Sequence, residues 1–163
     1  EVGTDYARRT GFEVVGRDGL TLTDAWRGGV RTLHGLYVHG FPNLFVESIA
    51  QSGFTVNFPY LLDVQATQVA WIINWALTHG ATEVEATTEA EAGWVDAVLA
   101  RSTGSVERAR NCTPGYYNRE GHATATTRQG SFFLGGPTEY AEILQAWRDD
   151  GGLDGLDVRG GSR

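Results

Sequence analysis

The sequence predicts a mixed α/β (or α+β) fold, and two patterns along the chain favour it. Residues 12–46 contain short runs of β-branched and aromatic residues separated by Gly, Pro, Asn and Asp, which is typical of strands and turns. From residue 57 onward, apolar residues recur at steps of three and four, the period of an amphipathic helix. The 163 residues, 41% of them hydrophobic, are enough for one compact domain with an ordinary core.

Short strands are expected in the first third of the chain. Residues 12–23 predict a two-stranded hairpin, because Asp18-Gly19 lies between β-branched and apolar runs. Residues 32–38 resume an extended pattern. Residues 44–46, Leu-Phe-Val, form a continuously apolar run that is typical of a strand buried on both faces.

A long helix is expected from Asn57 to Gly80. Asn57 is a good N-cap, Pro59 sits where a first-turn proline is tolerated, and Gly80 ends the pattern. In an amphipathic helix the apolar stripe faces the core. The apolar positions that share one stripe here are Leu62, Ala66, Val69, Ile73 and Ala76.

Two further helices and a terminal strand are expected. The second helix begins with Thr88 as cap and Glu91 as the partner in a capping box, and its apolar positions are Trp94, Val95, Val98 and Leu99. The third opens at Pro137-Thr138-Glu139, closes at Gly151-Gly152, and carries Tyr140, Ile143, Leu144 and Trp147. Residues 153–158 add a short strand.

A long irregular stretch, residues 111–136, separates the second and third helices. Loops of this length inside a compact domain are lids, binding loops or disordered segments. Its Tyr116-Tyr117-Asn118 run has two interpretations: a clamp for a planar ligand, or a packing anchor for the loop.

Charge and composition exclude several classes of partner. The formal net charge of −7 opposes binding to phosphate backbones and anionic membrane surfaces, so we expect no nucleic acid and no membrane partner. The most apolar stretch, residues 61–77, is interrupted by polar residues and falls short of the roughly 18–20 continuous apolar residues that span a bilayer. The single cysteine, Cys112, forms no internal disulfide, which fits the reducing cytoplasm.

Several signals are missing from the sequence. It contains no Met and begins at Glu1, so we expect either a processed start or a piece of a longer protein. It has no Gly-x-Gly-x-x-Gly or phosphate loop, so the chain alone does not cradle a dinucleotide pyrophosphate. No histidine pairs with another ligand at a recognised spacing, and no metal site is predicted.

The junction of residues 51–58 is the most suggestive local feature. A strand that runs into a helix N-terminus presents unpaired backbone N–H groups and a positive dipole end, which stabilise an oxygen gaining negative charge. The alternative is an ordinary strand-to-helix connection with Asn57 as its cap.

Four motifs carry a resemblance to a known family. They are GFPNLF at 40–45, QSGFTVNFP at 51–59, QVAWI at 68–72 and CTPGYYN at 112–118. With them the sequence resembles the C-terminal part of the Baeyer–Villiger monooxygenases, and the last motif is similar to the branch with cyclopentadecanone-type enzymes. The resemblance implies the C-terminal portion of an FAD/NAD(P)-binding, Rossmann-type, two-domain flavoprotein.

The resemblance also implies site residues and a division of the chain. Asn57 and Phe58 would face the flavin, Tyr116 would lie on the loop that closes over NADP, and the substrate pocket would be lined by Phe54, Thr55 and Tyr60. Residues 1–58 would be closing strands of the FAD-binding domain, followed by a helical segment at 59–110, a mobile loop at 111–136, and a C-terminal helix and tail at 137–163.

The implied function belongs to the whole enzyme, which would use FAD, NADPH and O2 to convert ketones to esters or lactones. Sequence upstream of Glu1 would bind most of both cofactors, so the isolated fragment would be inactive and its main partner would be the remainder of its own polypeptide. Two alternatives stay open: an N- or S-oxidising flavin monooxygenase, and a non-catalytic binding module derived from the same scaffold.

Overall fold

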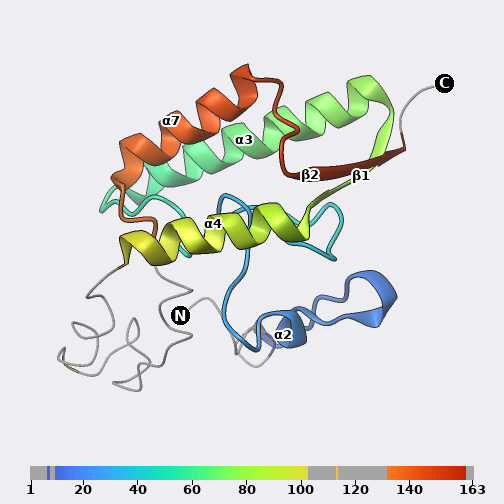
Figure 1. Ribbon diagram of the computed structural model, residues 1–163, viewed down its shortest axis with the longest axis horizontal. Coiled ribbons are helices and arrows are strands. Elements are labelled where there is room, and N and C mark those ends of the chain that lie inside the picture. Colours follow the sequence, from blue (N-terminus) through green and yellow to red (C-terminus); the bar gives the residue numbers. More distant parts are fainter. Residues whose placement is uncertain (1–6, 8–9, 103–112, 114–131, 161–163) are drawn as a thin grey trace.

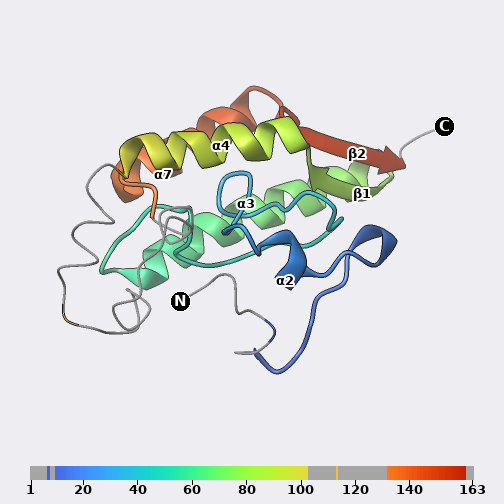
Figure 2. The ribbon, with the colours of Figure 1, turned by 60° about the horizontal axis from the view of Figure 1, so that its bottom comes forward.

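Three helices surround the main core of the molecule. The computed structural model describes residue 7, residues 10–102, residue 113 and residues 132–160. Helices α3 (Phe58–His79) and α7 (Gly136–Asp149) lie side by side and run in the same direction, whereas α4 (Thr88–Arg101) runs in the opposite one (Figure 1, Figure 2). Strands β1 (Ala81–Ala86) and β2 (Leu156–Gly160) pair antiparallel, with Val84 opposite Val158. This mixture of helices with a small sheet confirms the predicted fold class, as part of an α/β protein.

Helix α3 begins and ends where the sequence predicts. The Asn57 side chain accepts a hydrogen bond from the backbone N–H of Tyr60 at 3.3 Å. Gly80 adopts φ of +70°, the left-handed conformation that closes a helix and that glycine reaches without strain.

The predicted core face of α3 is wrong by about one residue position. The face that α3 buries consists of Leu61, Gln65, Gln68 and Ile72. Polar side chains are tolerated there because they are bonded: Gln65 Nε2 donates to the Ser48 carbonyl at 3.0 Å, and Gln68 Nε2 donates to the Tyr37 hydroxyl at 2.9 Å. The predicted stripe is half-buried or exposed, and Ile73 is 44% exposed.

Helices α4 and α7 confirm the expected positions, with one correction at a cap. Thr87, not Thr88, caps α4 by accepting from Ala90 N at 3.1 Å. Glu91 forms no capping box, because its buried carboxylate accepts from Arg31 Nε at 2.9 Å and from the backbone N–H of His39 at 3.1 Å. Strand β2 confirms the terminal strand, whereas its partner β1 was missed.

The first third of the chain is more irregular than predicted. In place of a hairpin, one antiparallel bridge joins Val15 to Thr21, with the 3₁₀ helix η1 (Arg17–Gly19) between them and helix α2 (Leu22–Ala25) after them. Residues 32–38 form a tight turn rather than a strand, because His34 and Gly35 both have positive φ.

The predicted strand at 44–46 is reduced to a single bridge between Tyr37 and Phe45, and its side chains are half-buried. This region therefore has its own small apolar cluster in place of a sheet. The cluster contains Leu22, Trp26, Val30, Val38, Phe41 and Ala50. Most of the predicted mobile loop lies outside the described residues, and the proposed domain divisions stay predictions.

Candidate functional site

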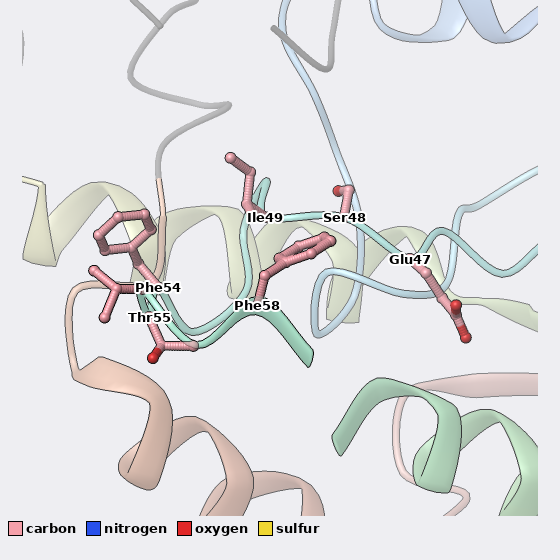
Figure 3. A pocket seen from close by; sticks show the side chains of 7 residues that line it. Glu47, Ser48, Ile49, Phe54, Thr55 and Phe58 are labelled. Atoms are coloured by element: carbon pink, nitrogen blue, oxygen red, sulfur yellow. The ribbon is translucent and has the colours of Figure 1, made fainter. Parts of the chain in front are cut away.

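A pocket of about 560 Å³ opens beside the start of α3. It is built by one continuous stretch of chain that leads from the bridge at Phe45 into the helix (Figure 3). Its lining residues are Glu47, Ser48, Ile49, Phe54, Thr55, Val56 and Phe58. The lining is mostly apolar and aromatic, with a few polar groups, which is the usual character of a small-molecule site.

Buried hydrogen bonds fix the backbone of this stretch. The Ser48 carbonyl accepts from Ser52 Oγ at 2.6 Å and from Gln65 Nε2 at 3.0 Å. The second bond attaches the loop that lines the pocket to α3. The Gln51 carbonyl accepts from the Trp94 indole N–H at 3.0 Å, which ties the same loop to α4. Gln51 has φ of +58° and is fully buried, and such a conformation persists only where the surroundings determine it.

Aromatic rings form one wall of the pocket. Phe54 stacks on Phe132, with ring centroids 4.4 Å apart, and the backbone N–H of Phe133 donates to the Ser52 carbonyl at 2.9 Å. A Cβ atom on Gly53 would lie 2.8 Å from Cβ of Tyr140, so only glycine allows α7 to approach this closely. The segment at 132–133 therefore supports the wall from a distant part of the sequence.

The electrostatics at the start of α3 favour a partial negative charge. The helix has 22 residues, and its dipole places positive partial charge at Phe58 and the following turn. No basic side chain is among the described lining residues, and Glu47 supplies the one carboxylate. The pocket thus suits a planar or apolar group with a polar edge at the helix end, and not a free phosphate.

The structure brings together some of the predicted site residues and separates others. The pocket beside the start of α3 is lined by Phe54, Thr55 and Phe58. Asn57 lies between them and caps α3. Tyr60 lines a different groove, between α3 and α7.

Tyr116 lies outside the described residues. Sequence reasoning missed Glu47, Ser48, Ile49 and Val56 as lining residues. The signal for the first three was their position directly after the GFPNLF run.

Three strongly shifted titratable groups lie in the core, away from the described lining residues. Burial raises the pKa of Tyr37 and that of Tyr140 far above the ordinary range of a phenol. Burial lowers the pKa of His34 to about 4. The Tyr140 hydroxyl donates to the His34 carbonyl at 2.8 Å, so these groups join α7 to the turn at 34–35 and have a structural role.

The described residues contain neither a metal-binding cluster nor a membrane-spanning helix. In that part of the chain, no three or more His, Cys, Asp or Glu side chains are grouped so that they could hold a metal ion. Nor does any helix there have the length and apolar character needed to cross a membrane.

The sequence is similar to monooxygenases over nearly its whole length. No family model matches it. It is 44% identical to FAD-binding monooxygenase hmp7 of Hypomyces subiculosus, over 91% of this chain and 25% of the relative. It is 38% identical to Baeyer–Villiger monooxygenase ATR8 of Stachybotrys chlorohalonatus, over 95% of this chain and 25% of the relative.

Solved structures agree with the sequence comparison. The polycyclic ketone monooxygenase from Thermothelomyces thermophila matches with a TM-score of 0.85 and 35% identity, over 94% of this chain and 25% of that one. An oxidised steroid monooxygenase bound to NADP matches with a TM-score of 0.76 and 29% identity, over 94% and 27%. The chain is therefore similar, over nearly its whole length, to a class of flavoprotein monooxygenases. Within that class it is homologous to the Baeyer–Villiger monooxygenases, and it spans about a quarter of their length.

Proposed function

We propose that the chain is a segment of a longer, flavin-dependent Baeyer–Villiger monooxygenase. Such an enzyme converts a ketone, O2, NADPH and a proton into an ester or lactone, NADP⁺ and water. The observation that carries the proposal is the identity of 38–44% to named monooxygenases over at least 91% of the chain. A cytoplasmic location goes with it, because a supply of NADPH and a single cysteine both fit that compartment.

The residues around the pocket fit the edge of a flavin and not its phosphates. Phe58, Ile49 and the start of α3 offer apolar contact and a positive dipole end to a planar ring whose pyrimidine side carries negative charge when reduced. FAD, when bound, takes electrons from NADPH and passes them to oxygen. Since the described lining contains no cation for a pyrophosphate, the phosphates would be held by sequence outside this chain.

Within this proposal, each residue of the pocket has a limited task. Asn57 and Phe58 hold the helix end beside the flavin, and Phe54 and Thr55 form the wall against the ketone. The stacked pair Phe54–Phe132 excludes water from that side. Tyr116 is proposed to close over NADP. Tyr60 contacts the ketone only if the groove in which it lies joins the pocket in the complete enzyme.

The first test uses the full-length protein. We expect visible flavin absorbance after purification, NADPH consumption that depends on a cyclic ketone, and a lactone product by mass spectrometry. A colourless full-length protein would contradict the proposal. So would consumption of NADPH that yields no oxygenated ketone product.

The second test maps the ketone wall in the same enzyme. Phe54→Ala removes the stacked ring, and we expect the KM for a bulky ketone to rise about tenfold, the usual size for loss of apolar contact. Thr67→Ala is the matched control, because Thr67 lines the groove between α3 and α7. An unchanged KM for Phe54→Ala would contradict the placement of the wall. A Tyr60→Ala rise as large as that of Phe54→Ala would place Tyr60 at the substrate as well.

A further inference from the structure

Gln51 lies at the centre of the loop that lines the pocket. Six of the lining residues form two groups, one on each side of it in the chain: Glu47, Ser48 and Ile49 before it, and Phe54, Thr55 and Val56 after it (Figure 3). Gln51 lies in a turn between the two groups, and its φ of +58° is uncommon for any residue other than glycine. The backbone conformation at Gln51 therefore sets how the two groups stand relative to each other.

The side chain of Gln51 is bonded at both ends of its amide. Its Nε2 donates to the Val30 carbonyl at 2.8 Å, and its Oε1 accepts from the Thr32 hydroxyl. Gln51 is 0% exposed and Thr32 is 1% exposed, so bulk water does not replace either bond. A buried amide that lost a partner would not recover its hydration, and the two bonds therefore hold the side chain in one arrangement.

Thr32 belongs to a turn that is itself fixed in the structure. Its Oγ1 accepts from the backbone N–H of Gly35 at 3.0 Å, and the His34 carbonyl in the same turn accepts from the Tyr140 hydroxyl of α7 at 2.8 Å. Gly35 packs directly against the loop, since a Cβ atom on it would lie 3.0 Å from the Gln51 carbonyl oxygen. This turn thus connects α7 to the centre of the pocket loop.

We infer that Thr32 and Gln51 are positioning residues, whose buried side-chain bond fixes the two groups of lining residues and so the place in which a ketone is held for oxygenation. The inference rests on the proposed function. Neither residue is among the described lining residues, so both act through the loop. A displaced ketone is oxygenated less often, because reaction requires close alignment of the reacting atoms.

The rival explanation is that the pair only stabilises the fold. A loss of stability lowers the amount of folded enzyme, so NADPH consumption and product formation fall in the same proportion. A displaced loop changes the ratio of the two. The oxygen that does not react with ketone then takes two electrons from NADPH and two protons, and it leaves as hydrogen peroxide. The amount of oxygenated product per NADPH consumed therefore separates positioning from stability.

The first measurement is hydrogen exchange by mass spectrometry on the full-length protein. Thr32→Val removes the hydroxyl and nearly keeps the shape of the side chain, whereas Thr32→Ser keeps the hydroxyl. We expect peptides from residues 47–56 to exchange about tenfold faster in Thr32→Val, the factor that corresponds to loss of one buried hydrogen bond. Thr32→Ser should exchange at nearly the parental rate.

The matched control is Thr21→Val, which also removes a threonine hydroxyl that accepts a backbone hydrogen bond. Thr21 caps α2 by accepting from Asp24 N at 3.0 Å, outside the pocket loop. Its loss should cost a comparable amount of stability and leave exchange at residues 47–56 unchanged.

The second measurement is the amount of oxygenated ketone formed per NADPH consumed by the same variants. We expect this ratio to fall about tenfold in Thr32→Val, with a matching rise in hydrogen peroxide. The ratio should stay at the parental value in Thr32→Ser and Thr21→Val. If Thr32→Val does not fold, Gln51→Asn replaces it, because Asn tolerates positive φ but is one methylene too short to reach both Val30 and Thr32.

Each outcome decides the inference. Parental exchange at residues 47–56 in folded Thr32→Val would overturn it, and so would faster exchange with an unchanged ratio. The same changes in Thr21→Val would assign the effect to stability and would also overturn it. Since hydrogen exchange needs neither FAD nor ketone, faster exchange in a full-length protein that oxygenates no ketone would reject the proposed function and keep the support of the loop by Thr32. Parental exchange in an active enzyme would reject the inference alone.

Discussion

The helical layer and the N-terminal segment, residues 10–56, are stabilised by interactions that differ in part. In the helical layer, side chains from α3, α4 and α7 meet in one apolar cluster that includes Ile72, Trp94, Tyr140 and Leu144. The N-terminal segment has a smaller cluster and little regular structure. Its Leu33, Leu36 and Tyr37 also pack in the cluster of the helical layer. Buried carboxylates of other elements add ion pairs to this attachment: Glu85 on β1 bonds Arg17 at 2.7 Å, and Glu91 on α4 bonds Arg31 at 2.9 Å.

This difference explains how well each region can be predicted from the amino-acid sequence. Packing of helices depends on apolar spacing, which is local in sequence. Attachment of the N-terminal segment depends on partners that lie about 60–70 residues away. The pocket lies where the two regions join, so its loop takes support from both.

The largest effect is expected in the helical layer. Trp94 is buried, stacks on Phe133 with centroids 5.1 Å apart, and donates to the Gln51 carbonyl. Trp94→Ala should lower the free energy of unfolding by about 3–5 kcal/mol, through a cavity and a lost hydrogen bond. Urea titration of the chain measures this, with the exposed Asp96→Ala as control. A loss below about 1 kcal/mol would mean that the helical layer is not the main source of stability.

A smaller loss is expected from the attachment of the N-terminal segment. Glu85 is 3% exposed and also accepts from the backbone N–H of Gly40 at 2.9 Å. Glu85→Ala leaves that buried N–H without its acceptor and removes one of the two carboxylates beside Arg17, which keeps its bond to Glu83; the loss should be about 2–3 kcal/mol. Glu89→Ala, at an exposed position of α4, is the matched control for loss of a carboxylate. Equal stability of the two variants would contradict the role given to the buried carboxylate.

A pH dependence should come from His34, which lies between the rings of Trp94 and Trp147. Burial lowers its pKa to about 4 in the folded state, below the value of about 6.5 in an unfolded chain. Below about pH 6.5 the unfolded chain binds a proton that the folded chain rejects, so stability falls as the pH drops. The loss should be about 2 kcal/mol between about pH 7.5 and about pH 5.

The control for this effect is His34→Asn, because Asn tolerates the positive φ of this turn and does not titrate. The difference between the unfolding free energies at the two pH values should shrink by nearly the whole amount in the variant. An unchanged difference would assign the pH dependence to other groups.

Local patterns predicted the helices well and the rest less well. Caps and periodicity located α3, α4 and α7. The rotation of α3 could not be predicted, because the partners that make Gln65 and Gln68 acceptable in the core, Ser48 and Tyr37, are distant in sequence. Strand β1 was missed because its Glu83 and Glu85 resemble a solvated segment until Arg17 is placed beside them.

The site shows the same limit. The motif at 51–59 pointed to three residues that line one pocket in the structure: Phe54, Thr55 and Phe58. Tyr60 was assigned to it too, although two residues along a helix turn a side chain by about 200°, away from Phe58 and toward α7. Glu47, Ser48 and Ile49 line the pocket because the hydrogen bond between Trp94 and the Gln51 carbonyl, 43 residues apart, fixes the path of their loop; in the sequence they are marked only by following the GFPNLF run.

The smallest expected effect lies at the boundary between the two regions. Asn57 ends the loop and caps α3 by accepting from Tyr60 N. Asn57→Ala should lower the free energy of unfolding by about 1 kcal/mol, whereas Asn57→Ser keeps an acceptor and should cost only a few tenths. Thr87→Ala, at the α4 cap, should match Asn57→Ala if both caps only stabilise helices. A loss for Asn57→Ala well above that of Thr87→Ala would show that this cap also holds the loop of the pocket, so that the two regions unfold together and not in succession.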